Sequence, residues 1–147
     1  MPDVSIPGCP FCEIVAGRLP ASELCRDDRV VAFLDIRPIT PGHLLVVPRS
    51  HAAGLADLPG PTGRAMFTTA QRLAAALRES GLRCDGVNFF LADGEVAGQE
   101  VDHVHLHVVP RFAGDGFRLR AQFMSPERAE LDATAGRIRP ALSSRKL

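Results

Sequence analysis

Histidines alternate with apolar residues in one short stretch of the chain, in the order His-Val-His-Leu-His-Val-Val over residues 103–109. Three of the five histidines of the 147-residue chain lie there, at His103, His105 and His107. Because successive side chains of a β-strand point to opposite faces, a strand over 101–109 places the three imidazoles on one face. The opposite, apolar face can pack on a core, while the imidazoles titrate near neutral pH. The pattern predicts a strand with ring positions roughly 7 Å apart.

The composition is that of an ordinary globular protein, with 46% hydrophobic and 23% charged residues. A chain of 147 residues is long enough for one domain with a real core. Its 17 basic and 17 acidic residues cancel, so we expect no broad surface for nucleic acid or anionic membrane. Residues 1–8 lack the pattern of a secretion signal, and no apolar run reaches the length of a membrane span. These features favour a cytoplasmic protein.

Short segments of alternating or apolar residues, separated by turn residues, predict several strands. These are expected at 23–26, 29–35, 43–47, 87–92 and 101–109, with Asp27-Asp28 as a hairpin turn between the first two. Helical spacing of apolar residues predicts helices over 10–17 and 62–80, the latter with Gly81 just beyond its end. A last helix is expected to open at Ser125-Pro126 and to end at Pro140. This order favours an α+β fold with an antiparallel sheet.

Three interpretations of the histidine stretch compete. The first is a surface strand that carries histidines without function, but three imidazoles at strict period two make that a minor alternative. The second is a zinc ion held by the three histidines, which would activate a water molecule. The third is an imidazole nucleophile that attacks phosphorus while its neighbours bind the phosphate oxygens.

The residues that flank the stretch favour the third interpretation. Gly94 and Gly98 precede it, and glycines let a backbone approach an anion closely. Gln99 offers an amide donor, and Arg111 follows with a side chain suited to phosphate recognition.

Residues 98–111, Gly-Gln-Glu-Val-Asp-His-Val-His-Leu-His-Val-Val-Pro-Arg, resemble the signature of the histidine triad (HIT) family. The resemblance extends to residues 9–17, 31–38 and 41–43, and so covers about 9–112. It implies a HIT-like fold, in which a five-stranded antiparallel sheet carries one long central helix and short terminal helices. One HIT domain would then span 1–147, with the C-terminal helix and tail at 125–147 outside the diagnostic part.

The resemblance also implies an activity, namely cleavage at the α-phosphorus of a nucleoside 5′-phosphate derivative. His105 falls on the family's nucleophile, which implies a nucleotidyl-histidine intermediate, and His107 falls on the histidine that contacts the phosphate. Asp35 matches the position that binds the ribose hydroxyls, and Phe33 lies where it would line the base pocket. Without the resemblance, Asp35 would be taken as a turn residue and Phe33 as a core residue.

The substrate implied is a purine nucleotide, either a phosphoramidate, a dinucleoside polyphosphate or a nucleotidyl sulfate. A homodimer whose two sheets join is implied as well. Two positions depart from the family pattern: Glu100 stands where many members have Ser or Thr, and Ala92 where some carry an amide. A carboxylate at position 100 would repel a phosphate unless it is paired, turned away or protonated.

Cys9 and Cys12 have the Cys-x-x-Cys spacing of one zinc knuckle. The resemblance to zinc-containing HIT members supplies two further ligands, His51 and His103, for a closed Cys₂His₂ site. Such a site would be structural, because all four positions of the zinc are occupied by protein. The alternatives are a metal-free pair of thiols and, less favoured, a redox-active pair.

Two other functions remain open at this point. One is a regulatory protein that binds a nucleotide with little turnover. The other is the three-histidine metallohydrolase, whose activity would depend on its metal.

Overall fold

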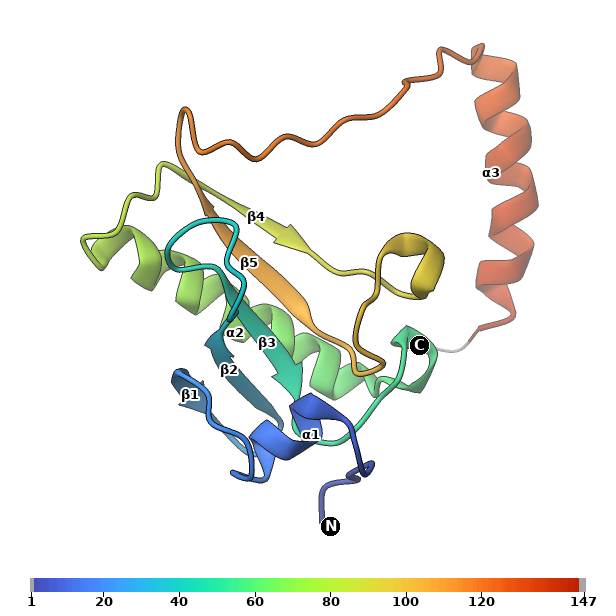
Figure 1. Ribbon diagram of the computed structural model, residues 1–147. Helices are drawn as coiled ribbons and strands as arrows, with labels where there is room; N and C mark the ends of the chain where they lie inside the picture. Colours follow the sequence, from blue (N-terminus) through green and yellow to red (C-terminus); the bar gives the residue numbers. More distant parts are fainter. Residues whose placement is uncertain (1, 146–147) are drawn as a thin grey trace. The chain divides into compact units, whose positions relative to one another are not determined.

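The computed structural model describes residues 2–145 and divides the chain into two compact units, Met1–Gly116 and Phe117–Leu147. The first unit holds a five-stranded antiparallel sheet in the order β1-β2-β3-β5-β4 (Figure 1). Its strands are β1 (Glu23–Arg26), β2 (Val30–Leu34), β3 (Leu44–Pro48), β4 (Gly86–Phe90) and β5 (Leu106–Arg111). Its helices are α1 (Pro10–Val15) and α2 (Gly60–Glu79), with short 3₁₀ turns η1 (Leu55–Asp57) and η2 (Glu95–Ala97). The predicted α+β class and five-stranded sheet are confirmed.

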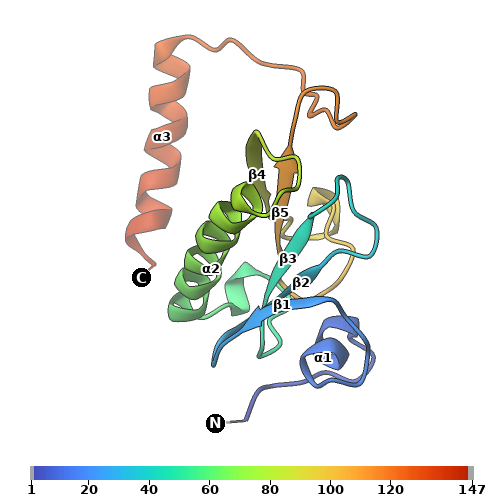
Figure 2. The ribbon, with the colours of Figure 1, turned by 90° about the vertical axis from the view of Figure 1, so that its left-hand side faces the viewer.

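Strands β2 and β3 are apolar along their whole length because both faces of the sheet are covered there. The long helix α2 lies along one face, and the short helix α1 lies on the other (Figure 2). Alternate residues of the strands divide between the two sides, as the pleat requires. The α2 side takes Val30, Ala32, Leu44, Val46, Val104 and Val108. The α1 side takes Val31, Phe33, Leu45 and Val47.

Local turn chemistry sets two of the connections. Asp27 accepts hydrogen bonds from the backbone N–H groups of Arg29 and Val30 at 2.8 and 2.9 Å, which closes the predicted hairpin between β1 and β2. Gly42, just before β3, has a φ of 96°. A Cβ there would lie 3.0 Å from side-chain carbons of Leu77 and Leu82, so position 42 needs glycine for both conformation and space.

The histidine strand differs from its predicted bounds. It was expected over 101–109 and to stop at Pro110, but β5 begins at Leu106 and includes Pro110. The pairing of β5 with β3 ends at Val108, so β4 is the only strand that pairs with the described chain at Pro110. A proline is tolerated in such a half-paired segment because no partner on the open side needs its missing N–H.

Before β5 the chain turns tightly instead of continuing as a strand. The backbone N–H of His103 donates to the Val101 carbonyl at 2.8 Å. Val104 nevertheless stays in the core on the α2 side, as the alternation predicted. Side chains therefore alternate between the two sides of the sheet as predicted, although His107 is the one histidine of the three that lies in β5.

Two other boundaries also moved. Helix α2 begins at Gly60 instead of Thr62, because Pro61, whose φ is fixed near the helical value, is well suited to a first helical turn. Strand β4 ends at Phe90 instead of Ala92, because Phe90 pairs with His107, near the first residue of β5. No helix in the described part of the chain is both long and apolar enough to cross a membrane.

The second unit contains α3 (Arg128–Ser143), which corresponds to the predicted last helix with both ends displaced toward the C-terminus. It begins two residues after Pro126, with Glu127 at its N-cap, and Ser125 does not cap it. It also runs through Pro140, where the sequence predicted its end. Gly136 lies four residues earlier, where the proline ring would meet a helix carbonyl, and a glycine backbone adjusts there most easily. The prediction of one domain over 1–147 stays a prediction.

Candidate functional site

A pocket of about 660 Å³ opens on the α1 side of the sheet. Its walls come from α1, the ends of β2, β3 and β4, and the loops before β3 and β5. The polar side chains that line it are Asp35, Arg37, His43, Glu100, His105 and His107. The apolar part includes Phe11, Ile14, Phe33, Leu45, Phe90 and Val101. A wall that is mostly apolar with a few convergent polar groups is typical of a small-molecule site.

The main chain fixes the tautomer of His105. Its Nδ1 lies 2.8 Å from the carbonyl oxygen of His103, and because a carbonyl only accepts, Nδ1 carries the hydrogen. The lone pair of the neutral ring is then on Nε2. Phe11 packs edge-on against this ring, with centroids 5.1 Å apart, and holds its orientation. His105 therefore lines the pocket as an oriented imidazole with a free lone pair.

A chain of hydrogen bonds fixes the tautomer of His107 through His43. The backbone N–H of Ile39 donates to Nδ1 of His43 at 3.0 Å, so the hydrogen of His43 is on Nε2. That Nε2–H donates to Nδ1 of His107 at 2.8 Å, which places the hydrogen of His107 on its own Nε2. The rings of His105 and His107 have centroids 5.0 Å apart. The pocket thus combines a lone pair on one histidine with an N–H donor on the next.

Burial favours the neutral forms of His43 and His107. It lowers the pKa of His107 to about 4, and the neighbouring His105 and His43 rings act in the same direction. Burial also lowers the pKa of His43. Asp35 opposes both shifts without overcoming them: its Oδ2 lies 3.5 Å from Nε2 of His43 and 3.9 Å from Nδ1 of His107. The neutral tautomer of His107 therefore persists well below neutral pH.

His43 was not among the site residues proposed from the sequence, where it was placed at the start of a strand. It lies just before β3, is almost fully buried, and forms the link between Ile39 and His107. Its position in the Pro-Gly-His segment that resembles the HIT family was the available signal.

Asp35 and Phe33 both line the pocket, as the resemblance implied. Asp35 follows β2, and its Oδ1 accepts from the backbone N–H of Arg37 at 2.8 Å. Its Oδ2 is the oxygen near the histidines. Phe33 is buried and meets Phe11 edge-on, with centroids 5.6 Å apart. It is therefore a core residue as well as a wall of the pocket.

Gln99 does not offer the free amide donor that the sequence analysis expected. Its Nε2 donates to the carbonyls of Ala53 and Val101 at 2.7 and 2.9 Å, and its Oε1 accepts from the N–H of Gly94 at 2.8 Å. Both amide hydrogens are used inside the fold, because the loop around η2 has backbone groups that no strand satisfies. Gln99 shapes the loop that carries Glu100.

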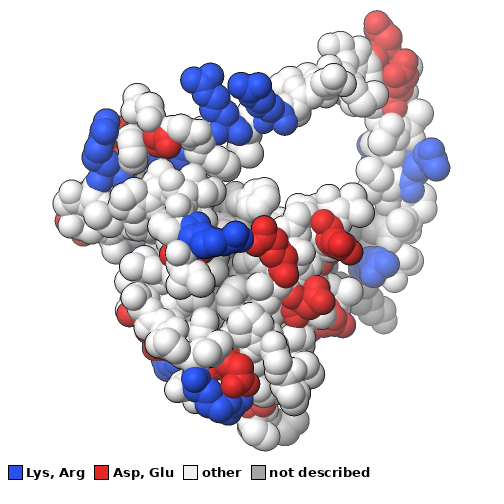
Figure 3. Space-filling model, in the orientation of Figure 1, with Lys and Arg blue, Asp and Glu red and all other residues white. Residues whose placement is uncertain are grey.

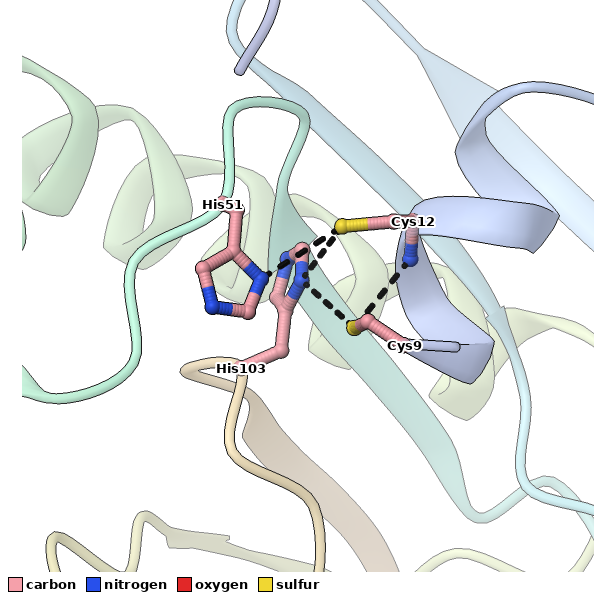
Figure 4. A group of neighbouring side chains, drawn as sticks. All are labelled: Cys9, Cys12, His51 and His103. Atoms are coloured by element: carbon pink, nitrogen blue, oxygen red, sulfur yellow. Dashed lines mark hydrogen bonds between the residues drawn. The ribbon is translucent and has the colours of Figure 1, made fainter. Parts of the chain in front are cut away.

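The two cysteines and two histidines predicted as zinc ligands lie together at the N-terminus of α1 (Figure 4). Sγ of Cys9 is 3.4 Å from Nδ1 of His103, and Sγ of Cys12 is 3.4 Å from Nδ1 of His51 and 3.6 Å from Nδ1 of His103. Sulfur and nitrogen ligands bound tetrahedrally to one zinc ion would be roughly 3.5 Å apart. The group therefore has the spacing of a metal site.

The protonation pattern of this group also suits a metal. Nε2 of His103 lies 2.8 Å from the Pro48 carbonyl and so carries the hydrogen, which leaves the Nδ1 lone pair facing the sulfurs. Burial lowers the pKa of His103 to about 4, which keeps its Nδ1 unprotonated. Burial raises the pKa of the Cys9 thiol, and a bound cation would oppose that shift by stabilising the thiolate. All cysteines of the chain are free. The donor set can hold a metal ion, and soft thiolates with imidazoles suit zinc.

The three-histidine metal site has no counterpart within residues 2–145. The ligand atom of His103 belongs to the cysteine group, whereas His107 groups with Asp35 and His43. The second group is poorly suited to a metal, because the Nδ1 lone pair of His43 is used by Ile39 and its Nε2 carries a hydrogen. A metal could bind there only if the ring became an imidazolate.

Comparisons with known proteins agree with this geometry. The HIT domain family model matches residues 16–114. A HIT-like protein of Mycobacterium tuberculosis is 39% identical over 135 residues, which cover 92% of this chain and 93% of that protein. An adenosine 5′-monophosphoramidase of Saccharomyces cerevisiae is 38% identical over 103 residues, or 70% of this chain and 62% of the yeast protein.

Two crystal structures show the same architecture. A protein of Streptococcus mutans, 37% identical, superposes with a TM-score of 0.88 and covers 94% of this chain and 87% of its own. A Zn-bound histidine triad family protein of Mycobacterium smegmatis, 43% identical, has a TM-score of 0.73 and covers 91% of this chain and 97% of its own. Sequence, fold and the arrangement of the histidines together establish that this chain belongs to the histidine triad (HIT) family.

Proposed function

We propose that this protein is a nucleotide hydrolase or transferase that cleaves at the α-phosphorus of a nucleoside 5′-phosphate derivative. One observation carries the proposal: in one pocket, His105 has its lone pair on Nε2 and His107 has its hydrogen on Nε2. The first group can attack phosphorus, and the second can donate to a phosphate oxygen as charge builds up there. The yeast relative, an adenosine 5′-monophosphoramidase, supports this class of reaction.

The reaction divides into two displacements. In the first, the lone pair of His105 Nε2 forms a bond to phosphorus, and the bond from phosphorus to the leaving group breaks. For a phosphoramidate, the leaving nitrogen keeps that electron pair and takes one proton from solvent to depart as an amine. In the second, water attacks phosphorus, the bond to Nε2 breaks with its pair returning to the ring, and one proton goes back to solvent. The nucleotidyl-histidine between the steps makes each barrier lower than a direct displacement.

The same pocket provides groups for the rest of a purine nucleotide. The carboxylate of Asp35, at the edge of the pocket, can accept hydrogen bonds from the two ribose hydroxyls. The apolar wall that includes Phe33 can pack against the base. Together with His107 at the phosphate, these contacts would hold the α-phosphorus near His105.

We propose that zinc is bound by Cys9, Cys12, His51 and His103 and that its role is structural, because four protein ligands leave it no open position. When bound, zinc would cross-link the N-terminal segment, through Cys9 and Cys12, to the segment before β5, through His103. That role matters for the pocket because the carbonyl of His103 fixes the tautomer of His105. Zinc thiolates persist in a reducing compartment, which favours the cytoplasm.

We also propose that the protein forms a homodimer through β4, an edge strand of the sheet. Phe90 at its end and Phe67 of α2 are about half exposed, and Phe67 packs edge-on against Phe89 of β4. Exposed aromatic side chains beside an unpaired strand edge suit a second copy of the sheet. Sedimentation of the protein alone, against a Phe67→Ser variant, tests this assembly.

The test of the activity is turnover of adenosine 5′-phosphoramidate, followed by intact-mass analysis of quenched reactions. His105→Asn keeps a side-chain donor for the His103 carbonyl but removes the nucleophile, so we expect an intact fold and a loss of roughly a thousandfold or more in kcat. Cys84→Ser, outside the pocket, is the matched control and should retain activity. If the wild type binds the nucleotide but His105→Asn turns it over equally fast, the protein is not this enzyme.

A further inference from the structure

One ion pair joins two loops at the mouth of the pocket. Nη2 of Arg37, in the loop before β3, lies 2.9 Å from Oε2 of Glu100, in the loop before β5. The two residues are 63 positions apart and both line the pocket. The backbone of Arg37 is fixed by its bond to Asp35, and the loop of Glu100 by Gln99. These contacts position the two backbones, whereas both side chains are largely exposed, 79% for Arg37 and 74% for Glu100, so the pair lies in solvent at the mouth.

This pair decides the charge that the pocket presents to a substrate. Arg37 is the one arginine or lysine among the described residues that line the pocket. Two carboxylates, Asp35 and Glu100, also line it. Because Arg37 is paired with Glu100, the described lining has no unpaired arginine or lysine to bind phosphates beyond the first.

The space next to Glu100 is acidic as well. A second recess shares Gly98 and Glu100 with the pocket, and its other walls include Glu95 and Asp102. Acidic side chains gather beside a basic group on this face of the molecule (Figure 3). A leaving group that extends past Glu100 would thus meet negative potential, which repels phosphates and attracts amines.

We propose that Arg37 and Glu100 act together as a charge filter for the leaving group. They favour a nucleoside 5′-phosphoramidate whose amine is neutral or positively charged, and they disfavour nucleoside polyphosphates. Glu100 does so in two ways, by occupying Arg37 and by repelling added phosphates. This inference rests on the proposed function for its substrate, and it names the leaving-group class that the site selects.

The filter predicts a specific effect of Glu100→Gln, which removes the charge at nearly constant size. Arg37 is then free to bind a second phosphate, and one repulsive charge is lost. The ratio of kcat/KM for diadenosine tetraphosphate to kcat/KM for adenosine 5′-phosphoramidate should rise several-fold, since the pair is exposed and screened by solvent. In an Arg37→Gln background the same change should raise the ratio much less, because no freed cation remains.

The experiment measures both kcat/KM values for the wild type, the two single variants and the double variant. Glu23→Gln is the matched control, because it breaks another exposed ion pair, to Arg26, outside the pocket. A third substrate, an adenosine phosphoramidate of a diamine, reports attraction of a cationic leaving group. Its kcat/KM relative to the unsubstituted phosphoramidate should fall several-fold in Glu100→Gln.

If none of the variants shows turnover, nucleotide binding still tests the charge filter. The dissociation constants of adenosine mono- and triphosphate are measured for the same variants, and Glu100→Gln should strengthen triphosphate binding several-fold relative to monophosphate. Absence of turnover with this binding pattern would refute the proposed function and retain the filter. A polyphosphate ratio that stays constant in Glu100→Gln, or that rises equally in Glu23→Gln, overturns the filter.

Discussion

The buried neutral state of His107 makes a prediction about stability at acid pH. The pKa of His107 is lowered to about 4 in the folded protein, against an ordinary value near 6.5. Below about pH 6.5 the unfolded chain therefore binds a proton that the folded protein excludes. The folded state becomes less stable relative to the unfolded chain. This contribution is fully present above pH 6.5 and is lost progressively as the pH falls toward 4.

The size of the effect follows from the two pKa values. If the pKa of a histidine falls from 6.5 to 4 on folding, the unfolding free energy is about 2 kcal/mol smaller at about pH 5 than at about pH 7.5. His107→Asn removes the titrating ring, and its Oδ1 can still accept the hydrogen bond from His43. We therefore expect the variant to lose about 2 kcal/mol less than the wild type over this pH interval.

Urea denaturation at the two pH values, with equal zinc in every sample, measures this difference. Titrating groups that do not contact His107, including His103, are common to both proteins and cancel in the comparison. Val108→Ala is the control: it removes buried apolar volume without a titrating group, so it should lower stability by roughly 1–3 kcal/mol at both pH values alike. If His107→Asn and the wild type have the same pH dependence within about 0.5 kcal/mol, His107 is not buried in the neutral form.

Three further predictions follow from the packing and the metal group. Gly42→Ala should lower the unfolding free energy by about 1–3 kcal/mol in urea titrations, because its φ is 96° and the new Cβ would lie 3.0 Å from Leu77; unchanged stability would contradict that packing. Thr40→Val should cost about 1 kcal/mol by the same measurement, since the buried hydroxyl donates to the Pro110 carbonyl at 2.7 Å. Cys12→Ser should purify without stoichiometric zinc by metal analysis and melt several degrees below the wild type, and full zinc content would remove Cys12 from the ligand set.

Local patterns in the sequence were sufficient for much of the fold. The alternation around the histidines correctly placed Val104 and Val108 in the core, and Asp27 correctly marked a hairpin turn. Both depend on the geometry of a few neighbouring residues, which is the same in any fold. The ends of β5 were less predictable, because they depend on where the partner strands stop.

The sequence by itself determined which chemical groups this protein has: imidazoles at alternate positions, a Cys-x-x-Cys pair and a carboxylate at position 100. The resemblance it carries also indicated which of them belong together. Only the tertiary structure decided what each group can do. The tautomer of His103 depends on the Pro48 carbonyl and that of His107 on His43, both distant in the sequence. Arg37 meets Glu100 across a similar separation. Hydrogen bonds and ion pairs act through space over a few ångströms, so their partners are known only once the chain has folded.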